Sequence, residues 1–304
     1  MLVSMKYLLD VANKNNFAVA APNVNHEMNV RSVIQAAEEM NAPLIIDIAY
    51  SETYDIEFLG PLTKKLCEEA SVPIAINLDH GGSRYKEFEP CLAEVMHAIR
   101  AGFTSVMVDR SSLPYEDNVE QVKYVSKLAH TLGVTVEAEL GHVGSGSLYG
   151  DPNDTRFTEP EEAKRYIEET GIDCLAVSVG TAHGVYKGVP QLDYERLQKI
   201  KEITGAPLVL HGGSGTGDEK LRKACTMGIN KVNVATDLYR SAADRVLATN
   251  LDGSNVYKLW PAIYDGWKDR LKELIEVFGS AGKASLYDVT SCSKSAQKQI
   301  ERGE

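Results

Sequence analysis

The sequence predicts an α/β fold, a closed (β/α)₈ TIM barrel with a C-terminal helical extension. Short apolar segments rich in Val, Ile and Leu alternate with amphipathic helical patterns, which indicates a parallel sheet covered on both faces. Eight such units lie between residues 17 and 250, a length that suits a closed barrel. An open, doubly wound sheet is the less favoured alternative, because no GxGxxG motif follows the first apolar segment.

The expected strands are nearly continuous runs of apolar residues, as in parallel strands that are buried on both faces. They cover residues 17–24, 43–49, 73–80, 104–110, 135–141, 174–180, 207–213 and 231–237.

An amphipathic helix is expected after each strand, and several of these helical patterns end in glycine, a common helix stop. Capping boxes at Thr158–Glu161 and Thr216–Glu219 indicate where two of the helices begin. The helical patterns cover residues 30–40, 58–70, 89–102, 118–133, 159–171, 194–205, 218–228 and 238–250, and a terminal helix covers 258–279.

We find no internal domain boundary, so residues 1–285 are expected to form a single barrel domain that includes the terminal helix. Residues 286–304 are expected to form a polar C-terminal tail. Long loops follow the fifth and sixth strands, at residues 142–157 and 181–191. Long loops on one face of a barrel usually cover the active site.

The composition indicates a cytoplasmic chain of 304 residues. Its formal net charge of −11 argues against nucleic acid and anionic membranes as partners, and no apolar run approaches the ~20 residues that span a bilayer. The amino-terminal residues lack the features of a secretory signal. The cysteines are scattered, odd in number and without a CxxC pair, which favours a reduced compartment: Cys67, Cys91, Cys174, Cys225 and Cys292.

Three histidines stand at the carboxyl ends of predicted strands three, six and seven. They are His80, His183 and His211, and each is followed directly by glycine. Strand ends of one barrel meet on one rim, where barrel enzymes carry their active sites. Three neutral imidazoles with one open position are typical of a catalytic zinc site. Of the other histidines, His97 and His130 lie in helical patterns, whereas His26 and His142 follow strands one and five on the same face but are less clearly framed by a strand end and a glycine.

Carboxylates accompany these histidines. Asp79 precedes His80, and it could orient an imidazole or act as a general acid/base if the following glycines let the chain turn. Glu137 and Glu139 are two residues apart on strand five and therefore point the same way. Glu139 is nearer the rim and could reach a metal, whereas Glu137 is expected in a deeper structural network.

The segment after strand seven indicates an anion site. His211 is followed by Gly-Gly-Ser-Gly and then by a helix, so that backbone N–H groups and the helix N-terminus are available to an anion. Asn233 and Thr236 at the end of strand eight would add donors. Barrels often bind phosphate after strands seven and eight, although a tight turn that needs small residues would look the same.

Taken together, these motifs resemble the class II (zinc-dependent) fructose/tagatose-bisphosphate aldolase family. The similarity covers about residues 4 to 250, and its motifs stand in the family's order. The matching strings are APNVN (21–25), LDHG (78–81), VEAELGHVG (136–144), GTAHGVYKG (180–188), LVLHGGSG (208–215) and KVNVATDL (231–238).

The resemblance implies reversible cleavage of a ketose 1-phosphate or 1,6-bisphosphate to dihydroxyacetone phosphate and an aldehyde. It implies one zinc ion per subunit on His80, His183 and His211 with Glu139 close by, and Asp79 as the acid/base. A monovalent cation near the phosphate site and a homodimer or homotetramer are further expectations. The implied substrate-binding residues are Asn23, Gly184, Gly212, Gly213, Ser214, Asn233, Val234, Ala235 and Thr236.

The sequence departs from the family in the part that would bind the aldehyde half. Ser147 stands where a loop glutamate that moves the C1 proton is expected, and Asp151, Asp154 or His142 could replace it. Ala49 stands near a common Ser or Thr. The string NLDGSNVYKLW occupies the region of an Asp-Pro-Arg segment that meets a second phosphate, and Arg240 and Arg245 are the candidate replacements.

Two other functions remain open at this point. The missing loop carboxylate favours a non-catalytic barrel that binds sugar phosphates or serves as an assembly subunit. A metal-dependent epimerase on the same barrel is the other alternative.

Overall fold

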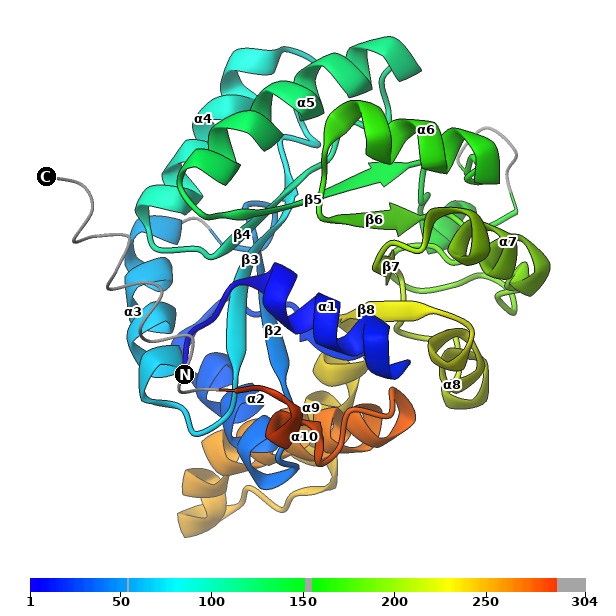
Figure 1. Ribbon diagram of the computed structural model, residues 1–304. Helices are drawn as coiled ribbons and strands as arrows, with labels where there is room; N and C mark the ends of the chain where they lie inside the picture. Colours follow the sequence, from blue (N-terminus) through cyan, green and yellow to red (C-terminus); the bar gives the residue numbers. More distant parts are fainter. Residues whose placement is uncertain (54, 151–154, 289–304) are drawn as a thin grey trace, which may run out of the picture.

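The computed structural model describes residues 1–53, 55–150 and 155–288, and Figure 1 shows a ring of helices around a central sheet. Eight parallel strands close into a barrel in the order of the sequence, which confirms the predicted fold class. The strands are β1 (Val19–Pro22), β2 (Leu44–Ala49), β3 (Ile74–Gly81), β4 (Ser105–Val108), β5 (Thr135–Leu140), β6 (Cys174–Val177), β7 (Leu208–Leu210) and β8 (Ile229–Val234).

Helices cover the outside of the barrel and follow the strands as the patterns predict. They are α2 (Glu27–Glu39), α3 (Ile56–Glu69), α4 (Phe88–Arg100), α5 (Tyr115–Thr131), α6 (Pro160–Thr170), α7 (Tyr194–Thr204), α8 (Asp218–Thr226) and α9 (Thr236–Ala248). The expected terminal helix is α10 (Leu259–Val277), which packs against α9 and α2. Short 3₁₀ segments are η1 (Gly146–Leu148), η2 (Gly253–Lys258) and η3 (Lys283–Leu286).

The amino-terminal segment forms an additional helix, α1 (Met5–Asn15), which lies across the amino-terminal end of the barrel (Figure 1). Its buried face packs against inward-pointing strand residues such as Val19, Ile45 and Met107. An amphipathic helix needs one apolar surface to cover, and the open end of the barrel supplies it. Helix α1 therefore closes the amino-terminal end of the barrel.

The two predicted capping boxes are wrong, although both helices begin within one residue of the predicted start. Helix α6 is capped by Glu159 and helix α8 by Gly217, so the predicted capping boxes at Thr158 and Thr216 do not form. The Thr158 hydroxyl instead donates to the carbonyl of Leu140 at the end of β5, and the Thr216 hydroxyl donates to the carbonyl of Gly212 at 3.0 Å. The two threonines therefore stabilise the backbone at the rim and do not cap the helices.

The chain stays packed slightly beyond the predicted start of its polar tail at residue 286. Tyr287 is buried, and its hydroxyl donates to the carbonyl of Leu8 in α1 at 3.0 Å. Residues 289–304, the rest of the predicted tail, lie outside the described residues, and so does Cys292. The other four cysteines are buried thiols, and among the described helices none is long and apolar enough to cross a membrane.

Candidate metal centre and substrate cavity

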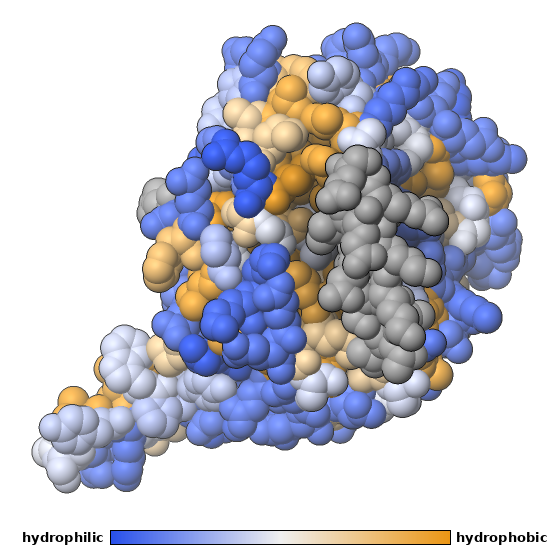
Figure 2. Space-filling model, turned by 60° about the vertical axis from the view of Figure 1, so that its left-hand side comes forward, coloured by the Kyte–Doolittle hydropathy of each residue, from blue (hydrophilic) through white to orange (hydrophobic). Residues whose placement is uncertain are grey.

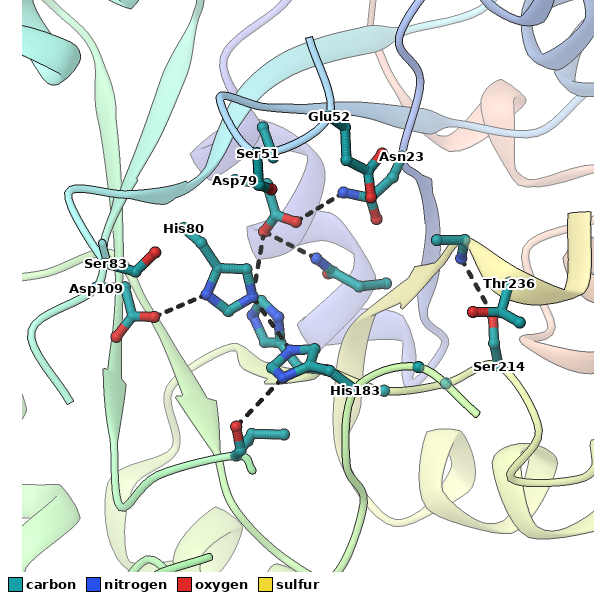
Figure 3. A pocket seen from close by; sticks show the side chains of 18 of the residues that line it. Asn23, Ser51, Glu52, Asp79, His80, Ser83, Asp109, His183, Ser214 and Thr236 are labelled. Atoms are coloured by element: carbon teal, nitrogen blue, oxygen red, sulfur yellow. Dashed lines mark hydrogen bonds and ion pairs between the residues drawn. The ribbon is translucent and has the colours of Figure 1, made fainter. Parts of the chain in front are cut away.

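The three predicted histidines meet on the carboxyl-terminal rim of the barrel (Figure 3). His80 lies near the end of β3, His183 lies in the loop after β6, and His211 directly follows β7. Their ring centroids are 4.6–5.6 Å apart. The strand-end positions therefore converge as the sequence predicts.

Asp79 and His80 both reach the cavity although they are consecutive residues. Strand alternation turns Asp79 inward in step with Asn77. His80 has a left-handed backbone (φ 49°), and the pairing of β3 with β4 shifts register between Leu78 and Gly81. This conformation is uncommon for a residue with a side chain, and such positions cluster at functional sites. The irregularity re-aims His80 beside Asp79.

One nitrogen of each imidazole faces the same point. The Nε2 atoms of His80 and His183 are 3.1 Å apart, and the three candidate ligand atoms all lie within 4.8 Å of one another. Nδ1 of His211 is fully buried and has no hydrogen-bond partner among the described residues. A buried nitrogen without a donor is costly, and a metal ion would satisfy it.

The other nitrogen of each ring is held by an acceptor, which fixes the orientation of the ring. His80 Nδ1 bonds to Asp109 Oδ2 (2.8 Å), His183 Nδ1 to the carbonyl of Val143 (3.2 Å), and His211 Nε2 to Glu137 Oε1 (3.0 Å). Each acceptor places the proton on the outer nitrogen and leaves the inner lone pair for a metal.

The surroundings keep two of the three rings neutral. Burial, together with the nearby His80 and His211, lowers the pKa of His183 to about 3, and burial also lowers the pKa of His211. Burial acts in the same direction on His80, but Asp79 and Asp109 outweigh it and raise the pKa to about 10. A metal bound here would displace a proton from His80.

Glu139 lies beside the three histidines, but it belongs to a second set of possible metal ligands. Its Oε1 accepts from the backbone N–H of Val143 at 2.8 Å, and its buried Oε2 has no hydrogen-bond partner among the described residues. Together with His80 and Asp109 it forms a second set of possible ligand atoms. Burial, followed by the charge of Asp109, raises the pKa of Glu139 to about 8.

A buried charge network supports the site from inside the barrel. Lys231 Nζ lies 2.8 Å from Glu137 Oε2 and 3.2 Å from Asp47 Oδ2, and all three side chains are fully buried. Asn77 donates to the other oxygen of Asp47 at 2.9 Å. Glu137 therefore links His211 to Lys231, in agreement with the deeper structural network predicted for it.

Asp79 is fixed by two amides beside the three histidines. Oδ2 accepts from Asn23 Nδ2 at 2.7 Å and Oδ1 from Asn233 Nδ2 at 3.0 Å. Burial alone would raise the pKa of Asp79, but the nearby His80, His211 and Lys231 hold it below its ordinary value. The carboxyl group is therefore a negatively charged acceptor beside the candidate metal ligands.

The glycine loop after β7 and the start of α9 form one end of the cavity. Ser214 Oγ accepts from the backbone N–H groups of Ala235 and Asp237, both at 3.1 Å, which ties the two loops together. Gly212 has φ 67°, and a Cβ atom there would lie 2.2 Å from the carbonyl of Ala182. Glycine is required because the β6 and β7 loops touch.

The cavity that these residues enclose has a volume of about 420 Å³. All of the predicted substrate-binding residues line it except Val234, whose side chain packs in the apolar core between the strands and the surrounding helices. The lining residues are Asn23, Ala49, Ser51, Glu52, Asp79, His80, Ser83, Asp109, His142, Val143, His183, Gly184, His211, Gly212, Gly213, Ser214, Asn233, Ala235 and Thr236.

The loop after β5 brings one of the candidate replacement bases into the cavity. His142 lines it, and its Nδ1 lies 2.8 Å from Ser111 Oγ. Ser147 is exposed, its hydroxyl bonds to Ser145, and it is not among the lining residues. Asp151 and Asp154 lie outside the described residues.

Five residues of the cavity lining were not among the candidates predicted from the sequence: Ser51, Glu52, Ser83, Asp109 and Val143. A signal existed for Asp109, because it stands one residue past β4 and strand ends share the rim. Glu52 and Ser83 lie in loops whose course the sequence alone does not define. Arg240 and Arg245, the candidates for a second phosphate, do not line the cavity, and Arg245 pairs with Asp269 on the outside.

Fold and site together define a barrel with three converging histidines, a candidate metal site, beside a glycine-rich loop, and comparison with known proteins identifies its family. The family model described as fructose-bisphosphate aldolase class-II matches residues 3–283. Fructose-bisphosphate aldolase of Geobacillus stearothermophilus is 38% identical over 299 residues, with 93% of this chain and 99% of that protein covered. The chain belongs to the class-II fructose-bisphosphate aldolase family.

Solved structures agree with this assignment. The YdjI aldolase of Escherichia coli K12 is 32% identical with a TM-score of 0.81, covering 93% of this chain and all of that one. Fructose-bisphosphate aldolase of Campylobacter jejuni is 21% identical with a TM-score of 0.77, covering 93% of this chain and 96% of that one, which shows the shared fold. The protein is an aldolase, a lyase of a family that acts on phosphorylated sugars.

Proposed function

We propose that the protein is a zinc-dependent aldolase that reversibly cleaves a ketose 1-phosphate or 1,6-bisphosphate to dihydroxyacetone phosphate and an aldehyde. The observation that carries this proposal is the convergence of three imidazoles, each with its outer nitrogen fixed, beside Asp79. The residues fit zinc because they offer three nitrogen ligands and leave a position open. Zinc at this site would supply a Lewis acid that polarises the ketone.

Asp79 is the group that we assign to proton transfer at C4. Cleavage breaks the C3–C4 bond while the C4 hydroxyl loses its proton and becomes a carbonyl. Asn23 and Asn233 aim the carboxylate, and its lowered pKa means that it is ionised, the form that can accept a proton. The bond electrons remain with the dihydroxyacetone phosphate half, which takes up a proton from a second group. His142 is our candidate for that group, because it lines the cavity.

The substrate phosphate is assigned to the loops after β6, β7 and β8. Gly184, Ser214 and Thr236 face the cavity there, and α9 begins at Thr236. A helix N-terminus and hydroxyl donors suit an anion. Binding the phosphate at this end would hold the reacting carbons over the histidines and Asp79, so that the reaction gains from fixed orientation.

Proton exchange at C1 of dihydroxyacetone phosphate tests the proposal without knowledge of the aldehyde. The zinc-loaded protein is incubated with this compound in deuterium oxide, exchange is followed by NMR, and aldehydes are then added. We expect exchange and then condensation. Absence of both, with the phosphate compound still bound, would contradict the proposal. Exchange that gives only isomerised products would favour an epimerase.

We also propose that the chain works in the cytoplasm as a homodimer or homotetramer. Leu247, Tyr257 and Trp260 are between 61% and 84% exposed near the junction of α9, η2 and α10. Figure 2 shows this end of the molecule as a projection at the lower left, with pale and orange residues near its tip. Exposed apolar clusters of this kind mark interaction sites. Light scattering would show a monomer if this part of the proposal is wrong.

A further inference from the structure

A second carboxylate enters the substrate cavity from the loop after β2. Glu52 follows that strand by three residues and lines the cavity. Its Oε2 atom is buried and has no hydrogen-bond partner among the described residues. A buried acceptor without a donor is costly unless a ligand supplies one. Nothing in the reaction proposed above uses this side chain.

Glu52 lies at the end of the cavity that the aldehyde half would occupy. Its side chain extends toward Asn23 and Asp79, whereas Ser214 and Thr236 lie across the cavity from it (Figure 3). Asp79 is the group assigned to the C4 oxygen, so the atoms beyond C4 continue from Asp79 toward the β2 and β3 loops. Ser51 and Ser83 line the same region.

The part of the cavity around Glu52 and Asp79 carries acidic side chains and is unsuited to an anionic group. Among the described residues that line the cavity, none is lysine or arginine. Burial, followed by the Asp79 carboxylate, raises the pKa of Glu52, so negative charge is already unfavourable there. A second phosphate in this region would meet two acidic side chains without a cation to balance it, and close like charges oppose binding. Serine hydroxyls and a carboxyl group suit a polyhydroxylated chain.

Arg84, in the loop after β3, is a cation that could change this balance. Its guanidinium bonds to the buried Glu94 through Nε at 2.8 Å. It also lies over the ring of Tyr50, 5.3 Å from the centroid, and it does not line the cavity. Its charge is therefore paired with Glu94 and is not available to balance a substrate phosphate in the cavity.

We propose that Glu52 is a specificity-determining residue that selects an uncharged, hydroxylated aldehyde, so that the substrate is a ketose 1-phosphate and not a 1,6-bisphosphate. The carboxyl group accepts a hydrogen bond from a hydroxyl of the aldehyde half and disfavours a phosphate at the same place. This inference rests on the proposed function and narrows its substrate class.

Condensation with paired aldehydes tests the inference. The zinc-loaded protein receives dihydroxyacetone phosphate with racemic glyceraldehyde or racemic glyceraldehyde 3-phosphate, and kcat/KM is measured for each aldehyde. We expect the uncharged aldehyde to be favoured by about tenfold or more, as one close like-charge contact allows. Glu52→Gln should reduce this ratio by about tenfold, chiefly because the phosphorylated aldehyde reacts better. Glu57→Gln, which removes an exposed carboxylate on α3, is the matched control and should leave the ratio unchanged.

The other possible outcomes distinguish failure of this inference from failure of the proposed function. A wild-type preference for the phosphorylated aldehyde, or equal changes for both aldehydes in Glu52→Gln, would overturn the inference but leave the aldolase proposal intact. Proton exchange at C1 without condensation of glyceraldehyde would also overturn it. Loss of both exchange and condensation in the wild-type protein would instead contradict the proposed function.

Discussion

At the scale of single residues, the candidate site depends on the partners of the imidazoles as much as on the imidazoles themselves. Each outer ring nitrogen has a defined acceptor: the carboxylates of Asp109 and Glu137 and the carbonyl of Val143. The acceptors fix which nitrogen carries the proton and where the free lone pair points. Substitution of a residue that orients a ring should therefore change metal affinity, whereas substitution of a residue that transfers a proton should change the reaction rate.

Asp109→Asn should weaken metal binding. The change keeps the shape of the side chain but removes the charge that faces His80 Nδ1, and loss of such a partner typically lowers metal affinity ~10–100-fold. Competition with a chelator would measure the zinc affinity of the variant. Asp173→Asn removes the carboxylate beside His130 on the outside of the barrel and should have no effect. Equal zinc affinity in the two variants would refute the role of Asp109.

Asp79→Asn should separate two steps of the reaction. We expect cleavage to fall by ~10²–10⁴-fold, the usual contribution of a general acid/base. Zinc content and C1 proton exchange should remain, because the change leaves the histidines and the phosphate loops in place. Cleavage close to the wild-type rate would show that another group serves C4.

At the scale of elements, the loops after β5 and β6 position His183 jointly. The backbone N–H of His183 donates to Gly144 at 2.8 Å, and Gly146 donates to the carbonyl of His183 at 2.7 Å. A Cβ atom on Gly146 would lie 2.8 Å from the carbonyl oxygen of Val185. The two loops are therefore in backbone contact on both sides of the histidine.

Gly146→Ala should displace the β6 loop and weaken zinc binding, because the added methyl group meets backbone atoms that cannot rotate away. The matched variant is Gly188→Ala, where the nearest neighbour of the new atom is a Tyr149 carbon at 3.8 Å and the fit is ordinary. Chelator competition and thermal unfolding of both variants provide the comparison. If the two bind zinc equally well, the loop contact does not position His183.

The sequence predicts strands and rim histidines well because both depend on local patterns. Apolar runs show where each strand lies, and a barrel then requires His80, His183 and His211 to share a rim. The left-handed backbone of His80 could not be predicted, since the bulge that produces it involves pairing with β4. Contacts between loops, such as the backbone hydrogen bonds that join the β5 loop to His183, depend equally on the assembled barrel.

At the scale of the whole molecule, a closed barrel encloses charges that have no access to water. Lys231 is fully buried, and Asp47 and Glu137 compensate its charge. Burial alone would lower the pKa of Lys231, but these carboxylates raise it well above its ordinary value. The network crosses the barrel from β2 to β5 and β8, so it couples the stability of the fold to the orientation of His211.

Lys231→Met should destabilise the fold by about 3–5 kcal/mol, because it leaves two buried carboxylates without their partner. Urea unfolding followed by circular dichroism would measure the change. Lys272→Met removes a partly exposed partner of Glu39 and should cost less than about 1 kcal/mol. Similar losses in both variants would mean that the buried network contributes little.

Zinc titration of the chelated protein tests the central claim most directly. Wild-type protein is stripped of metal and reloaded, while bound zinc and aldol condensation are measured on the same samples. Activity should be absent without metal and rise with zinc to a maximum at one ion per chain, and His211→Ala should neither retain zinc nor catalyse. Full activity in the metal-free chain, or in that variant, would contradict the account.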